Sequence, residues 1–135
     1  MLEQLSVFVE NEIGSVAKVT RVLKENMINI RAISAFDSPE FGILRVVVDK
    51  PSIARDILIK EGFAVRVSKV IGVELTDTPG DLDQVLTILA KENLNLNYIY
   101  SFVLRGENPP LMVMNIDQMD LAVSILKENG IKVLN

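Results

Sequence analysis

Two short segments of the chain place polar residues and a glycine directly before a predicted helix. They are Asn11-Glu12-Ile13-Gly14 and Asp77-Thr78-Pro79-Gly80. A glycine lets the backbone come close to a ligand, and the unpaired N–H groups and dipole of a helix start suit a carboxylate. Asn11 or Asp77 would offer a side-chain oxygen to an ammonium group. Each segment could therefore hold both charged ends of a free amino acid, although the same residue types also form ordinary turns.

An asparagine follows each segment at the same spacing. Asn29-Ile30 begins 18 residues after Asn11, and Asn95-Leu96 begins 18 residues after Asp77. Both pairs stand at the start of a predicted strand. An asparagine amide offers a donor and an acceptor to a bound zwitterion. The alternative is that each asparagine only closes the turn between a helix and a strand, where this residue is common.

The residue types that many enzymes use are missing. The chain contains no Cys and no His, which excludes thiolate nucleophiles, Ser-His-Asp triads, disulfides and imidazole ligands. Carboxylate, lysine or tyrosine chemistry remains, but the sequence shows no nucleophile, base or metal site built from these residues. We therefore expect a protein that is not an enzyme and that uses neither a metal ion nor a cofactor.

The charge balance argues against polyanionic partners. The chain has 14 Lys and Arg against 18 Asp and Glu, a net charge of −4, whereas a surface that follows phosphates needs the opposite sign. No apolar stretch approaches the roughly 20 residues that span a bilayer, and Glu3 stands where a secretory signal would carry Lys or Arg. We expect a cytoplasmic protein that binds neither nucleic acid nor a membrane.

The elements that must position these residues follow from an internal repeat. When Gly14 is set on Gly80, 66 positions later, the apolar residues of the neighbouring strand and helix coincide. The offset grows to 68 in the later part of each copy, because the second copy has a longer loop at residues 105–110. The repeat predicts two domains, residues 1–70 and residues 71–135.

Alternating periodicities predict the order β-α-β-β-α-β within each copy. In the first copy, strands are expected at residues 5–9, 29–36, 43–48 and 63–67. An apolar helical stripe marks the first helix at Val16, Val19 and Leu23. Ser15 is expected to cap this helix, and Asp81 to cap its counterpart. In the helix that Pro51 opens, Ile53, Ile57 and Leu58 are expected to face the core.

This order predicts an α+β fold made of two ferredoxin-like βαββαβ sandwiches, each with a four-stranded antiparallel sheet and helices on one face. Domains this small are marginal alone, so we expect the copies to be packed together and to pair with a second chain. Residues 64–77 form one nearly continuous extended stretch that joins the copies. The second strand of each copy should lie at a sheet edge.

The N/D-x-x-G loop, the helix after it and the Asn-Ile pair together resemble the ACT domain, a regulatory module that binds small molecules. The resemblance covers nearly the whole chain, twice. It implies domains paired side by side and amino-acid effectors bound at the pair interface. The ligand-binding residues that it implies are Asn11, Glu12, Ile13, Gly14, Asn29 and Ile30 in the first copy, and Asp77, Thr78, Pro79, Gly80, Asn95 and Leu96 in the second.

Two functions follow from this resemblance. The first is an amino-acid-binding, effector-sensing regulatory protein that forms a homodimer and binds a free amino acid at ACT-domain interfaces. The second is a non-catalytic regulatory or structural subunit of an amino-acid biosynthetic enzyme, which binds a protein partner instead of a free ligand. The loop chemistry would recognise the charged groups common to all amino acids, so the sequence does not select one of them.

Overall fold

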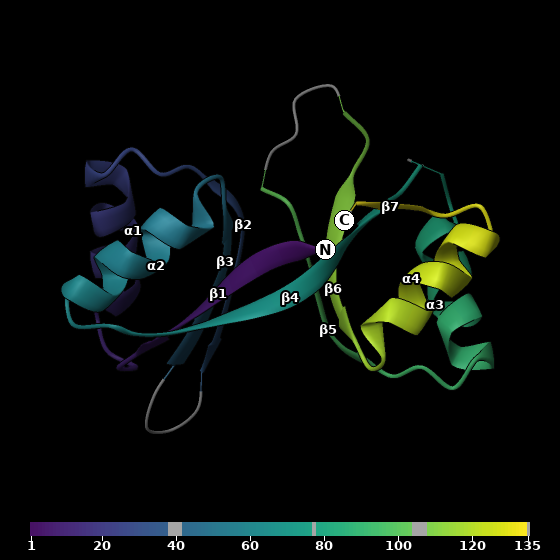
Figure 1. Ribbon diagram of the computed structural model, residues 1–135, viewed down its shortest axis with the longest axis horizontal. Coiled ribbons are helices and arrows are strands. Elements are labelled where there is room, and N and C mark those ends of the chain that lie inside the picture. Colours follow the sequence, from purple (N-terminus) through teal and green to yellow (C-terminus); the bar gives the residue numbers. More distant parts are fainter. Residues whose placement is uncertain (38–41, 77, 104–107, 135) are drawn as a thin grey trace. The chain divides into compact units, whose positions relative to one another are not determined.

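The computed structural model describes residues 1–37, 42–76, 78–103 and 108–134. The chain forms two compact units, Glu3–Ser68 as the first and Met1–Leu2 with Lys69–Asn135 as the second. The elements, drawn in Figure 1, are β1 (Leu2–Val9), α1 (Ser15–Glu25), β2 (Ile30–Asp37), β3 (Gly42–Val48), α2 (Pro51–Lys60), β4 (Ala64–Glu74), α3 (Asp81–Lys91), β5 (Leu96–Ser101), β6 (Leu111–Ile116), α4 (Met119–Glu128) and β7 (Lys132–Leu134).

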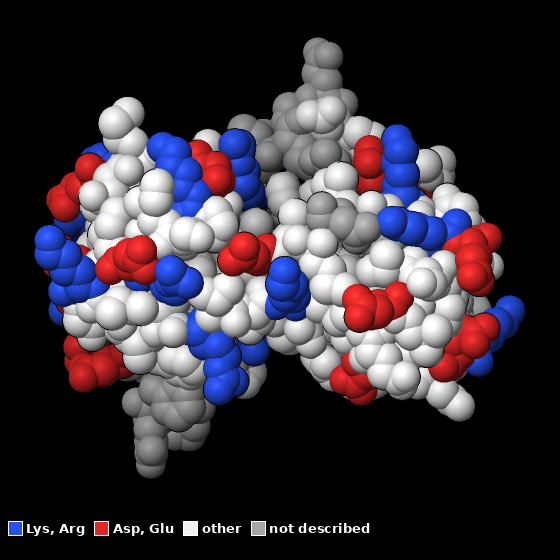
Figure 2. Space-filling view, in the orientation of Figure 1, with Lys and Arg blue, Asp and Glu red and all other residues white. Residues whose placement is uncertain are grey.

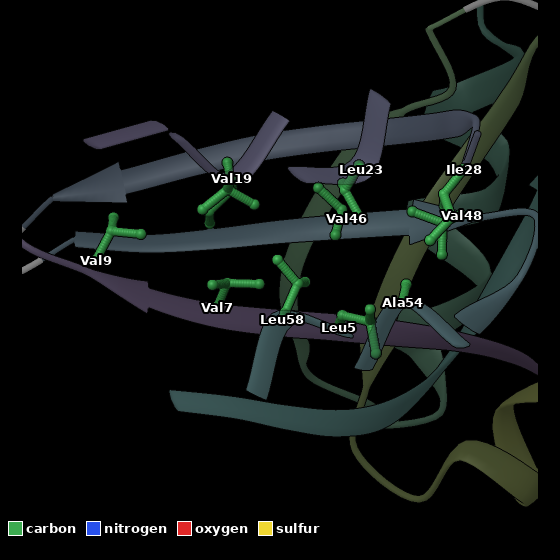
Figure 3. Close-up of a cluster of buried hydrophobic side chains, with 11 residues drawn as sticks. Leu5, Val7, Val9, Val19, Leu23, Ile28, Val46, Val48, Ala54 and Leu58 are labelled. Carbon is green, nitrogen blue, oxygen red and sulfur yellow. The ribbon is translucent and has the colours of Figure 1, made fainter. Parts of the chain in front are cut away.

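The first unit is a sheet with strand order β2-β3-β1-β4 and two helices on one face. The strands β1 and β2 both pair antiparallel with β3, which sets Leu5 and Ile33 on either side of Val46. Alternate residues of the strands meet the apolar stripes of α1 and α2 in a closed core (Figure 3). Its fully buried members are Leu5, Val7, Val19, Leu23, Leu44, Val46, Ala54 and Leu58.

The second unit repeats this architecture with the strand order β7-β4-β6-β5. Its core comes from β4 and β6 and from the inward faces of α3 and α4. The predicted ferredoxin-like βαββαβ fold of each copy is therefore confirmed. The strands β2 and β5 end the two strand orders, so the second strand of each copy is an edge strand, as predicted.

The strand β4 is an uninterrupted strand of 11 residues and contributes to both units. This agrees with the extended stretch predicted between the copies. The boundary of the compact units falls between Ser68 and Lys69, inside this strand. We keep residues 1–70 and 71–135 as the proposed domains.

The starts of α1 and α3 differ from the prediction. Gly14 and Gly80 occupy the N-cap positions with φ of 86° and 85°, and neither helix has a side-chain cap. Glycine adopts this left-handed conformation without the steric cost that other residues meet. Ser15 and Asp81 are instead the first helical residues, so the predicted capping role of both is wrong.

The buried stripes of the first unit's helices also differ in detail. Val16 is 38% exposed, and the buried residues of α1 are Ser15, Val19 and Leu23, a spacing of four residues. In α2 the predicted inward residue Ile53 is 53% exposed, because Ala54 and Leu58 carry the buried face. One predicted core position in each helix is therefore wrong, whereas Val19, Leu23 and Leu58 are buried as predicted and Ile57 packs against the core partly buried.

Candidate functional site

The first loop, residues 11–14, joins β1 to α1 and is exposed throughout. Its backbone is tightly folded: the Ser15 N–H donates to the Glu12 carbonyl at 3.2 Å, and the Lys18 N–H donates to the Gly14 carbonyl at 3.0 Å. The N–H groups of Val16 and Ala17 have no acceptor among the described residues. These two donors, at the positive end of the helix dipole, face outward where an anion can reach them.

Two hollows of about 280 and 200 Å³ lie beside this loop within the first unit. They share Val9, Glu10, Glu12 and Ser15 in their walls. The larger hollow adds Lys18, and apolar residues make up most of the rest of the two walls: Phe8, Phe63, Val16, Ala35, Phe36, Ile43 and Leu44. The place therefore combines charges of both signs with apolar surface, which are the features that a free amino acid presents.

Asn29 lies at the opposite end of α1. Its N–H donates to Asp49 Oδ1 at 2.9 Å, and its carbonyl accepts from the Asp49 N–H at 3.1 Å. The backbone of Asn29 thus closes the turn, while its exposed side chain makes no hydrogen bond with any described residue. Ile30 begins β2 beside it, and both residues line an open hollow of about 550 Å³.

The structure does not bring the first loop and Asn29 together within one unit. The 11 residues of α1 separate them, a length of about 16 Å at 1.5 Å per residue. A single amino acid is too short to touch both ends. A ligand that contacts the loop and an Asn29 side chain therefore needs a second unit.

The second loop is held by its own side chains. Asp77 lies outside the described residues, and Thr78, Pro79 and Gly80 are exposed. The carboxylate of Asp81 accepts hydrogen bonds from the backbone N–H and the hydroxyl of Thr76, the latter at 3.0 Å. The Thr76 and Thr78 hydroxyls are 2.8 Å apart. A carboxylate of the protein itself thus stands at the start of α3.

Asn95 is part of an amide cluster that the sequence analysis missed. Its Nδ2 donates to Asn97 Oδ1 at 2.9 Å, and Asn97 Nδ2 donates to Asn115 Oδ1 at 2.8 Å and to Asp117 Oδ1 at 3.1 Å. The signal was present in the sequence, because Asn95 and Asn97 are two residues apart and alternate residues of a predicted strand share one face. Leu96 lies between them, half-buried at the start of β5.

Glu10, Ser15 and Lys18, which line the hollows, and the N–H groups of Val16 and Ala17 were also not assigned to the site by the sequence analysis. A residue that opens a helix one position after a left-handed glycine has no sequence signature that separates it from an N-cap residue.

In the described part of the chain, no group of three or more acidic side chains could hold a metal ion. No helix there is long and apolar enough to cross a membrane.

The charged side chains of the described residues are mixed in sign on the face that Figure 2 shows. In Figure 2, Lys and Arg side chains are interspersed with Asp and Glu side chains over the face in view. A continuous positive surface of the kind that follows a nucleic-acid backbone is not seen on that face.

Comparisons with known proteins agree on the fold. A family model described as an ACT domain pair matches residues 1–135. Protein BT0572 from Bacteroides thetaiotaomicron is similar at 34% identity and a TM-score of 0.91, over 98% of this chain and 91% of that one. The ligand-free regulatory subunit of aspartate kinase from Thermus thermophilus shares 17% identity and a TM-score of 0.67, over 94% and 91% of the two chains. A search of curated protein sequences finds no match.

Proposed function

The chain belongs to the family of ACT domain pairs, and from this we propose that it is a regulatory protein that binds a free amino acid. The observation that carries the proposal is the start of α1, where outward N–H groups, a lysine, two glutamates and apolar hollows meet. The family relationship supports regulation by a small molecule. The local chemistry supports a zwitterion with an apolar part as that molecule.

In this proposal the ligand carboxylate lies against the N–H groups of Val16 and Ala17. The ammonium group lies toward Asn11 and the carboxylates of Glu10 and Glu12. The ligand side chain enters one of the apolar hollows beside the loop. Each contact is a binding contact, so the protein would act by changing its association with itself or with a partner, with no bond made or broken.

We further propose that the complete site forms between two chains of a cytoplasmic homodimer. The loop of one chain would supply the helix-start donors, and the Asn29 side chain of the other would supply an amide. This arrangement accounts for two exposed half-sites at opposite ends of α1. It also lets the ligand control how firmly the two chains associate.

A second candidate is a non-catalytic subunit that binds an amino-acid biosynthetic enzyme instead of a free ligand. Its specific support is that the Thermus thermophilus regulatory subunit, a separate chain of similar length, has this fold over 94% of the present chain. Affinity purification of the tagged chain under native conditions separates the two candidates. A stoichiometric enzyme partner favours the second, and the homodimer alone favours the first.

Thermal unfolding in the presence of each of the twenty amino acids tests the proposed function. A ligand at about 100 times its Kd stabilises the folded state by about 2.7 kcal/mol. We expect at least one amino acid to raise the midpoint of unfolding in a concentration-dependent way. If none does, binding of a free amino acid is refuted.

A further inference from the structure

The hollow beside the first loop has a counterpart in the second unit. The second hollow has a volume of about 350 Å³, and Thr76, Asp81 and Gly130 are among its lining residues. These positions correspond through the internal repeat to Glu10, Ser15 and Gly62 of the 280 Å³ hollow. The two copies therefore offer the same backbone setting with different side chains.

Ser15 and Asp81 make the decisive difference, since they are the equivalent first residues of α1 and α3. Ser15 is 7% exposed, yet its hydroxyl makes no hydrogen bond with any described residue. No fully enclosed side-chain oxygen or nitrogen atom of the described residues lacks a partner, so this hydroxyl is not sealed in the core, and Ser15 lines both hollows beside the loop. Asp81 instead places a carboxylate at the helix start and holds it against Thr76.

The asparagines that follow the C-terminal ends of α1 and α3 show the same difference between the copies. The Asn29 side chain makes no hydrogen bond with the described residues, whereas the Asn95 amide donates to Asn97 in a cluster that continues to Asp117. In the second copy, the Asp81 carboxylate and the Asn95 amide are thus both held by other groups of the protein. In the first copy, the Ser15 hydroxyl and the Asn29 amide are both without such a partner.

We propose that only the first copy binds the carboxylate of an amino acid, with the Ser15 hydroxyl as a direct ligand, and that Asp81 fills the equivalent place in the second copy. This inference rests on the proposed function and adds its stoichiometry, one amino acid per chain. The second copy then has the same fold but binds no ligand, because the Asp81 carboxylate already supplies a negative charge at the start of α3. The ligand class is an α-amino acid with a free carboxylate.

Isothermal titration calorimetry on the full chain tests this inference, with the amino acid that most raises the unfolding midpoint. We expect one ligand per chain, and no detectable heat from the carboxamide of the same amino acid. Ser15→Ala should weaken binding roughly ten-fold or more, because it removes one hydrogen bond to a charged group. Ser15→Asp should abolish binding, since it installs the carboxylate that the second copy carries.

The matched control is Asp81→Ser, which makes the reciprocal change in the second copy. We expect the affinity of the first site to stay within about two-fold of the unmodified protein. Two equal sites per chain, or loss of binding in Asp81→Ser together with unchanged binding in Ser15→Ala, would overturn the inference and leave the proposed function intact. Absence of binding by all twenty amino acids would instead refute the proposed function.

Discussion

At the scale of single residues, equivalent positions of the two copies differ in the hydrogen bonds that their side chains make. Asn29 and Asn95 stand at equivalent places, but only the Asn95 amide is tied into a side-chain cluster. In both copies the asparagine carbonyl accepts from an aspartate N–H, Asp49 in the first and Asp117 in the second. The backbone therefore keeps the turn, and the side chain is what distinguishes a contact available to a ligand from one already used.

Replacing these asparagines should separate binding from stability. We expect Asn29→Ala to weaken amino-acid binding roughly ten-fold, with unfolding free energy changed by less than about 0.5 kcal/mol, because only an exposed amide is lost. Asn95→Ala should leave binding unchanged and cost up to about 1 kcal/mol through its bond to Asn97. Calorimetry and urea unfolding measure the two effects. Equal binding losses in both variants would contradict the asymmetry.

The sequence revealed the candidate loops but not the state of their side chains. The segments 11–14 and 78–80 are exposed at helix starts, as their Gly and polar residues indicate. Ser15 was expected to be a cap because Ser commonly precedes a helix. Gly14, in a left-handed conformation, occupies the N-cap position instead, and Ser15 becomes the first residue of the buried face of α1. A shift of one residue at a helix start depends on local backbone conformation, which residue types alone do not determine.

At the scale of elements, the helix starts depend on two glycines with positive φ. A Cβ added at Gly14 or Gly80 would meet nothing within 4 Å, so the requirement comes from the backbone conformation and not from crowding. The strands were predictable because alternate residues face a single core. One position of each helix stripe was predicted wrongly, since the apolar side chains of Val16 and Ile53 are exposed while the smaller Ser15 and Ala54 beside them are buried.

Alanine at these glycines should destabilise the fold by a similar amount in each copy. We expect Gly14→Ala and Gly80→Ala each to lower the free energy of unfolding by about 1 kcal/mol, the cost of a left-handed conformation for a residue with a Cβ. Urea unfolding followed by circular dichroism measures the loss. Unchanged stability in both variants would show that the helix starts tolerate another conformation.

The carboxylate of Asp81 should stabilise the second copy more than its neighbour Asp83 does. Both lie in the first turn of α3 and gain from the helix dipole, but only Asp81 accepts hydrogen bonds from Thr76. We expect Asp81→Ala to cost about 1 kcal/mol in urea unfolding and the control Asp83→Ala a few tenths. Equal losses would mean that the dipole alone accounts for the acidic turn.

At the scale of the whole molecule, the repeat made the fold class predictable. Two copies with matched strands, helices and turn glycines indicate two sandwiches of one type, and the structure has them. The exact division was beyond the sequence, because β4 is one continuous strand through the junction and Met1–Leu2 groups with the second unit. The extended stretch itself was predictable, but no residue type marks where the division falls within it.

A site completed by two chains should couple ligand binding to dimerisation. We expect the amino acid that raises the unfolding midpoint to shift a dilute sample from monomer toward dimer, because in the proposed dimer the loop of one chain meets the Asn29 side chain of the other. Sedimentation velocity with and without the amino acid measures the shift, with Asn29→Ala as the control that should respond less. A ligand whose affinity is the same at all protein concentrations would contradict a shared site.

The most direct measurement of the central claim is a ¹⁵N–¹H correlation spectrum of the chain, titrated with each of the twenty amino acids in turn. If the start of α1 receives the ligand, the amide signals of Gly14, Val16 and Ala17 should move for at least one amino acid. The equivalent amides at the start of α3 should stay in place. Amides around residues 11–17 that do not move under any of the twenty, at millimolar ligand, would contradict the account.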